Sequence, residues 1–138
     1  MLTIGDMSRA SGVKVPTIRY YEQIGLMPDP ERNAGNQRRY SGRMLDRLTF
    51  IRHARDLGFG TDAIAALLEL QDRPQTPCAT ANRIAQDQLA DVRARIARLT
   101  RLQAELERMT TACSGTGTAG DCAILASLAD HAQCTADH

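Results

Sequence analysis

The chain has 138 residues, with 17 lysines and arginines against 16 aspartates and glutamates, so its formal net charge is only +1. This length suits one compact domain, or a small domain with an extended arm, and the balanced charge alone indicates neither a nucleic-acid nor a membrane partner. No apolar run approaches the length of a membrane span and the chain begins without a signal-peptide core, so we expect a cytoplasmic protein with no membrane partner.

Two short helices joined by a glycine-containing turn are predicted at the start of the chain. The first covers residues 2–10, where Thr3 and Asp6 have the spacing of a capping box, and the second begins at Pro16 and ends near residue 22. Such a pair fits a helix-turn-helix. The second helix carries side chains that can bind phosphates and base edges, namely Thr17, Arg19, Tyr20 and Tyr21. We expect one of the two tyrosines to contribute to the core as well.

A basic hairpin, or wing, is predicted at residues 32–40, with its turn near Asn33. Between Arg32 and Arg55 the chain has seven arginines and one acid, Asp46. This local excess of positive charge makes the segment a candidate phosphate-binding surface despite the neutral total. The wing residues expected to contact double-stranded DNA are Asn36, Arg38, Arg39 and Tyr40.

Two further helices are expected before the middle of the chain. Ser41 is suited to cap a helix that ends near Leu57, and Thr61 is suited to cap the next one. Pro74 and Pro77 then form a rigid linker into a much longer helix.

The long helix is predicted over residues 79–112, which contain neither glycine nor proline. Its apolar positions follow the alternating four- and three-residue spacing of a coiled coil, with one polar interruption. This seam consists of Ala85, Leu89, Val92, Ile96, Leu99, Gln103 and Leu106. An unpaired helix of this kind would leave its apolar stripe in water, so we expect a second copy of the chain to cover it. The alternative is a helix packed within its own chain, with unrelated cysteines.

Three cysteines flank the long helix, Cys78 before it and Cys113 and Cys122 after it. A helix of this length spans about 50 Å, so Cys78 cannot meet the other two within one chain. Antiparallel pairing of two copies would bring Cys78 of one chain beside Cys113 and Cys122 of the other. Cysteines of a reducing compartment are metal ligands or redox thiols more often than structural disulfides. Together with the antiparallel pairing, this predicts a homodimer with two thiolate sites, each shared between the chains.

A series of short motifs runs in order through the first 70 residues. They are Ile4-Gly5-Asp6, Thr17-Ile18-Arg19-Tyr20-Tyr21-Glu22, Gly25-Leu26, Gly35-Asn36-Gln37-Arg38-Arg39-Tyr40, Phe50-Ile51-Arg52 and Leu57-Gly58-Phe59. Together they resemble the MerR family of transcriptional regulators, closely in this part and in layout through Cys122. Asp6 departs mildly from the pattern, because the family often has glutamate there.

The resemblance implies a mainly α protein in four parts. These are a winged helix-turn-helix DNA-binding domain at 1–74, a linker and antiparallel coiled-coil dimerisation helix at 75–112, a metal-binding loop and short helix at 113–130, and a flexible tail at 131–138. It also implies a dimer that binds promoter DNA with an over-long spacer and distorts it when an effector binds. RNA polymerase is then affected only through the promoter.

Within this family, the cysteine spacing resembles the branch that senses divalent soft metals: mercury, lead, cadmium and zinc. Copper sensors usually have serine where this chain has Cys78, and an added thiolate suits a divalent ion because it neutralises more charge. Zinc sensors tend to have a second cysteine beside the first loop cysteine and a histidine in the loop. This chain has Ser114 and no loop histidine. Its three cysteines are closer to the lead, cadmium and mercury sensors, and the sequence leaves the inducing metal open.

The last residues contain His131, Cys134 and His138, whose spacing suits a second metal site or a terminus with chance ligands. Two functions compete with metal sensing: a thiol redox sensor in which Cys113 and Cys122 form a disulfide, and a metal-sequestering protein with a vestigial DNA-binding half. The intact basic wing argues against the second. No His, Asp and nucleophile set at useful spacing indicates an enzyme.

Overall fold

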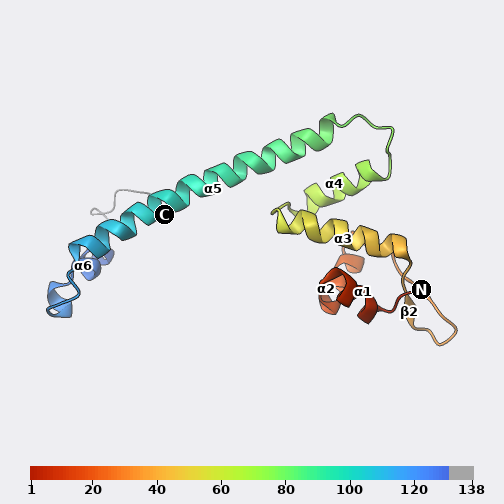
Figure 1. Cartoon of the computed structure of the whole chain (residues 1–138), viewed down its shortest axis with the longest axis horizontal. Coiled ribbons are helices and arrows are strands. Elements are labelled where there is room, and N and C mark those ends of the chain that lie inside the picture. The colour runs from red at the N-terminus through yellow and green to blue at the C-terminus, as the bar shows by residue number, and fades with distance from the viewer. Residues whose placement is uncertain (131–138) are drawn as a thin grey trace. The chain divides into compact units, whose positions relative to one another are not determined.

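A computed structural model describes residues 1–130 of the chain, and Figure 1 shows its elements in chain order. The chain divides into two compact units, Met1–Ile84 and a second that begins at Ala85. The predicted four-part division was finer than this and stays a prediction. The tail with His131, Cys134 and His138 lies outside the described residues. The elements are α1 (Ile4–Ser11), α2 (Val15–Gln23), β1 (Glu31–Arg32), β2 (Arg38–Arg39), α3 (Gly42–Asp56), α4 (Thr61–Gln71), α5 (Ala79–Ala112), η1 (Ala119–Asp121) and α6 (Ala123–Ala129).

Helices α1 and α2 form the predicted helix-turn-helix pair. The capping box of α1 is confirmed, because the Asp6 N–H donates to Thr3 Oγ1 and the Thr3 N–H donates to Asp6 Oδ2, both at 3.0 Å. Gly12 ends α1 with a φ of 75°, a left-handed conformation that favours glycine. A side chain there would also collide with Arg52, whose Nη1 atom donates to the Ser11 carbonyl at 2.6 Å. The turn is therefore fixed by its own backbone and by α3.

The wing is a two-stranded antiparallel hairpin of β1 and β2, in which Glu31 pairs with Arg39 and Arg32 with Arg38. Its turn is held by Asn33, whose Oδ1 atom accepts hydrogen bonds from the N–H groups of Gly35 and Gln37. Beyond β2, Leu2 and Tyr40 exchange two backbone hydrogen bonds of 2.8 Å. These bonds tie the wing to the first residues of the chain.

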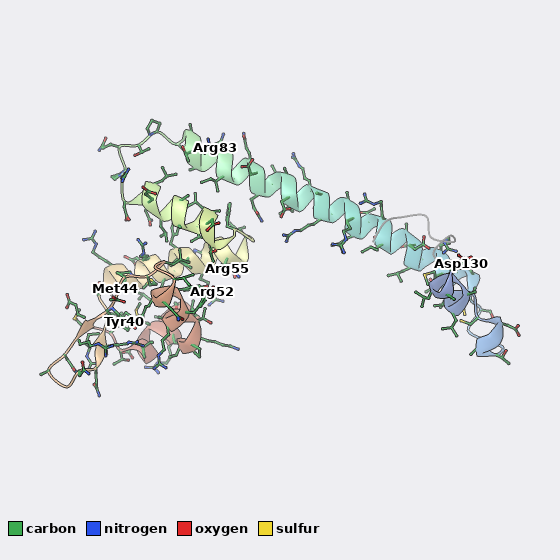
Figure 2. All side chains as sticks on the ribbon, turned by 180° about the vertical axis from the view of Figure 1, so that it is seen from behind. Tyr40, Met44, Arg52, Arg55, Arg83 and Asp130 are labelled. Carbon is green, nitrogen blue, oxygen red and sulfur yellow. The ribbon has the colours of Figure 1, made fainter. Side chains whose placement is uncertain are left out.

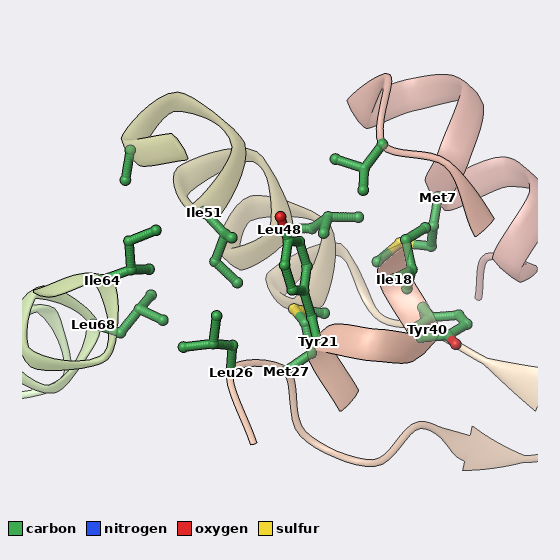
Figure 3. Packing of buried hydrophobic residues seen from close by; sticks show 12 residues of the cluster. Met7, Ile18, Tyr21, Leu26, Met27, Tyr40, Leu48, Ile51, Ile64 and Leu68 are labelled. Atoms are coloured by element: carbon green, nitrogen blue, oxygen red, sulfur yellow. The ribbon is translucent and has the colours of Figure 1, made fainter. Parts of the chain in front are cut away.

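The core of the first unit is formed by side chains from α1 to α4 and from the segments between them (Figure 3). Its fully buried members include Leu48 and Ile51 of α3 and Ile64 and Leu68 of α4. Burying one such side chain contributes roughly 1.5–3 kcal/mol. The predicted cap of α3 is confirmed, since Ser41 Oγ accepts from the Met44 N–H, but that of α4 is wrong. Gly60 is the N-cap there, and Thr61 is the first helical residue.

The second unit consists of most of α5, followed by η1 and α6. Helix α5 has the bounds that the absence of glycine and proline predicts. Four large apolar residues of its seam remain exposed, namely Leu89, Ile96, Leu99 and Leu106. Short helix α6 begins directly after Cys122, within the range 113–130 expected for the loop and short helix together. Within the described residues, no helix is long and apolar enough to span a membrane.

Candidate nucleic-acid interface and thiol site

Helix α2 presents only part of its predicted DNA-binding set to solvent. Arg19 and Tyr20 are exposed, and Thr17 is half-buried. Tyr21 is buried, with 7% of its surface exposed, and packs in the core beside Met27 and Leu48 (Figure 3). The expectation that one of the two tyrosines contributes to the core is therefore met by Tyr21. Within the predicted set, the donors that reach solvent are therefore those of Thr17, Arg19 and Tyr20.

The wing adds further cations next to α2. A cleft of about 600 Å³ is lined by Arg19 of α2 and by Arg32, Arg38 and Arg39 of the hairpin. Asn36, also at this cleft, is exposed at the tip of the wing with a φ of 62°. Several guanidinium groups around one opening suit the closely spaced phosphates of a nucleic-acid backbone, because each presents donors in a fork that matches phosphate oxygens.

Tyr40 is the member of the predicted DNA-contacting set that the structure corrects. Its side chain is fully buried, so its ring cannot reach a phosphate from this position. Its hydroxyl donates to Glu22 Oε2 at 2.6 Å. Burial raises the pKa of Tyr40 far above its ordinary value, and the hydrogen bond and charge of Glu22 raise it further. Tyr40 is thus a neutral donor that fastens the end of the wing to α2.

The arginines of α3 also divide into two kinds. Arg47 Nε donates to the Leu26 carbonyl at 2.7 Å, and Arg52 caps α1 as described above. Arg43 and Arg55 are exposed, and Arg55 is seen at the end of α3 in Figure 2. Within α3, the local charge excess therefore overstated the number of arginines free to bind phosphates, because Arg47 and Arg52 bind backbone carbonyls instead.

The two loop cysteines lie together in the second unit. The Sγ atoms of Cys113 and Cys122 are 3.8 Å apart, and both residues are half-buried. They belong to the wall of a 260 Å³ pocket formed by the loop between α5 and α6. Gly115 and Gly117 turn this loop, with φ values of 74° and 93°. Cys78 is exposed directly before α5, with the whole helix between it and the thiol pair.

The start of α6 makes the thiol of Cys122 more acidic. The Leu125 N–H at the start of α6 lowers the pKa of Cys122 below its ordinary value, and the Cys113 thiol and the Ile124 N–H act in the same direction. A lower pKa favours the thiolate, which is the form that binds metal. Within residues 1–130, no group of three metal-binding side chains comes together in one chain. The pair would need a third ligand from elsewhere.

Comparison with known proteins identifies the family. The model described as "MerR HTH family regulatory protein" matches residues 2–71, about half of the chain, and "MerR, DNA binding" matches residues 45–109. The chain belongs to the MerR family. It is therefore a DNA-binding transcriptional regulator and not an enzyme.

Relatives of this MerR-family chain are similar over nearly its whole length. It is 40% identical to the mercuric resistance operon regulatory protein of Pseudomonas fluorescens, over 92% of this chain and 87% of that protein. It is also 40% identical to the HTH-type transcriptional regulator ZntR of Escherichia coli K12, over 93% and 92%. The crystal structure of PbrR691 from Ralstonia metallidurans CH34 in complex with lead(II) superposes with a TM-score of 0.81 at 38% identity, over 93% and 99%.

One part of the thiol region of this MerR-family chain was missed by sequence reasoning. Glu105 of α5 and Ser127 of α6 are buried, although both are polar. Arg108 forms an ion pair with Glu105 and donates to Ser127 Oγ at 3.5 Å, so it joins the two helices. Leu125 and Leu128 of α6 are 50% and 72% exposed, so these two apolar side chains do not hold the helix in place. A polar cluster holds α6 in place, and only its burial in the fold reveals it.

Proposed function

We propose that this MerR-family chain is a cytoplasmic homodimer that activates metal efflux or detoxification genes when it binds a divalent soft metal ion. The single observation that carries the proposal is the 3.8 Å separation of the Cys113 and Cys122 thiols. Two thiolates bound to a tetrahedral zinc ion, each about 2.3 Å from the metal, lie about 3.8 Å apart. The two sulfurs are not bonded to each other, since a disulfide would place them about 2.05 Å apart. The pair thus fits two positions of a metal site.

The third ligand is proposed to be Cys78 of a second copy. Cys78 lies outside the reach of the pair in its own chain, because an intact helix of about 50 Å separates them. The exposed leucines of α5 give the second copy a surface to cover. Three thiolates suit lead, cadmium or mercury, and a solvent molecule would complete a zinc site. The relatives named for mercuric resistance and bound to lead(II) support this class of ion without choosing among its members.

The proposed shared site explains how metal binding reaches the DNA. Cys78 belongs to the same compact unit as the winged helix-turn-helix, whereas Cys113 and Cys122 belong to the other unit. An ion bound to all three would tie the DNA-binding unit of one subunit to the thiol loop of its partner. We propose that this tie favours a twisted promoter, which RNA polymerase then engages. The DNA contacts proposed for each subunit are Thr17, Arg19, Tyr20, Asn36, Arg38 and Arg39.

Mixed dimers test the shared site. A Cys78→Ser chain and a Cys113→Ser, Cys122→Ser chain each lack a complete site alone. If ligands are shared, the heterodimer regains one complete site. We expect lead(II) titration, followed by thiolate-to-metal charge-transfer absorption, to give one ion per heterodimer and none at this affinity in either homodimer. Absence of binding in the heterodimer, with two ions per wild-type dimer, would contradict the sharing of ligands.

A second candidate function is thiol redox sensing on the same fold, which the closeness of the two thiols favours. Hydrogen peroxide would oxidise Cys113 and Cys122 to a disulfide, taking two electrons and two protons and leaving two water molecules. In vitro transcription separates the two functions. The metal proposal expects activation by a soft divalent ion under reducing conditions, whereas activation by peroxide and by no metal would establish the redox function instead.

A further inference from the structure

A buried carboxylate lies within the basic surface of the first unit. Glu22 of α2 has only 6% of its side chain exposed, and it lines a 520 Å³ cleft together with Arg19, Arg32 and Arg38. A carboxylate close to DNA phosphates repels them, so its place among these arginines needs a reason.

Both oxygens of Glu22 engage the end of the wing. Oε2 accepts the hydrogen bond from the Tyr40 hydroxyl at 2.6 Å, and Oε1 lies 3.8 Å from Arg38 Nη1. The Tyr40 bond has the short length of a charge-assisted O–H···O⁻ contact. Because α2 and the wing are distant in sequence, this is a tertiary link that sets the position of one DNA-facing element against the other.

Arg38 depends on this link for its orientation. Its side chain is 29% exposed, and its Nε atom is buried without a hydrogen-bond partner among the described residues. The ion pair with Glu22 is therefore the contact that directs its guanidinium group. A guanidinium already held in place loses less conformational freedom when it binds a phosphate.

We propose that Glu22 is a positioning residue for DNA binding, a negative charge that strengthens the affinity for DNA by orienting Arg38 and the wing. The inference rests on the DNA contacts proposed above for Arg19 and Arg38. It predicts a change in DNA affinity opposite to the one that charge repulsion alone predicts. If Glu22 acted only through its charge, its removal would tighten binding, whereas removal of a positioning residue weakens it.

The test compares Glu22→Gln with Asp29→Asn in the full-length dimer. Asp29 is exposed on the wall of the same cleft and takes no part in the Glu22 cluster, so it is a matched control for the loss of one charge. The probe is a DNA duplex selected by the wild-type protein from a random-sequence pool, with affinity measured at several salt concentrations. We expect Glu22→Gln to bind about tenfold more weakly, with a salt slope smaller by about two per dimer, one phosphate contact in each half-site. Asp29→Asn should bind as tightly as wild type or more tightly, with an unchanged slope.

A double-mutant cycle shows whether Glu22 acts through Arg38. Arg38→Met should weaken binding about tenfold in the wild-type background and less than twofold in the Glu22→Gln background. Circular dichroism and thermal melting establish that each variant is folded, and the glutamine retains an acceptor for Tyr40. Equal losses of DNA affinity from Arg38→Met in the two backgrounds, or tighter DNA binding by Glu22→Gln, would overturn the proposed role of Glu22. Neither result would overturn the DNA contact of Arg38. No loss from Arg38→Met in the wild-type background would overturn the proposed DNA contact and this inference with it.

Discussion

The two units of the chain bury their apolar side chains to very different degrees. Among residues 1–130, the first unit contains every buried hydrophobic side chain except Met109. The second unit instead exposes a row of large apolar residues on α5, including Leu99 at 63% and Leu106 at 60%. The first unit therefore has a core of its own, whereas the second has an apolar surface that the proposed second copy would cover. Mutations that remove apolar groups should affect the two units in different ways.

Charged side chains introduced into the seam of α5 should have the largest effect, a loss of dimer affinity. Leu99→Asp combined with Leu106→Asp replaces four leucines per dimer. At about 1.5 kcal/mol each, the loss is about 6 kcal/mol, or roughly four orders of magnitude in the dimer Kd. Sedimentation equilibrium measures it. Ala94→Asp is the control, because Ala94 is exposed on the opposite face of the helix. An unchanged dimer Kd in the double variant would show that this seam is not the interface.

A cavity in the core of the first unit should have the next largest effect. This effect should be on the stability of the fold and not on dimerisation. Leu48→Ala removes a fully buried side chain and should lower the free energy of unfolding by about 3 kcal/mol, without changing the dimer Kd. Leu57→Ala makes the same chemical change where the side chain is 67% exposed, and should cost less than about 0.5 kcal/mol. Urea denaturation of both variants gives the difference. Equal losses would mean that exposure does not distinguish these two leucines.

The features that the sequence predicted correctly depend on residues close together in the chain. The seam and the bounds of α5 depend on periodicity and on the absence of breakers, and the capping box of α1 depends on a spacing of three residues. These features are local, and the sequence contains them in full. Thr61 was predicted to be the N-cap of α4 but is its first helical residue, because glycine also suits an N-cap and Gly60 occupies that position.

Features that depend on tertiary contacts could not be predicted from spacing. Tyr40 was expected at the DNA and is buried against Glu22, a residue 18 positions away. The link between Arg108 and Ser127 spans 19 positions. The proximity of Cys113 and Cys122 followed from the short loop between them, whereas the role of Cys78 depends on a second chain and stays a prediction. Residue type and period predict an element, but a polar contact between two elements requires the fold.

The polar cluster of α6 should have an intermediate effect. Glu105→Gln removes the buried carboxylate that pairs with Arg108 and should destabilise the packing of α6 by about 1–2 kcal/mol, less than for a fully buried pair because the Arg108 side chain is 37% exposed. Without firm packing of α6, the loop between the thiols must be ordered when the ion binds. This ordering costs free energy, so we expect about tenfold weaker lead(II) binding. Apo-protein affinity for DNA should not change.

Asp91→Asn is the control for this cluster. Asp91 forms an ion pair with Arg95 at 3.0 Å in the same helix, but both side chains are more than half exposed. Lead(II) titrations of the two variants should differ, with the affinity of Asp91→Asn equal to that of wild type. A loss of the same size in both would show that burial of Glu105 adds nothing to metal binding.

The smallest effect should come from a single arginine on the surface of the first unit. Arg19→Ala removes one exposed guanidinium from the cleft beside the wing, so each half-site loses one phosphate contact. The slope of log K against log salt should shrink by about two per dimer, while the dimer Kd and the free energy of unfolding stay as in wild type. Arg73→Ala makes the matched change in an exposed arginine that pairs with Glu69, away from this cleft, and should leave the slope unchanged. If both variants keep the wild-type slope, Arg19 does not contact a phosphate, and the DNA-facing side of the first unit lies elsewhere.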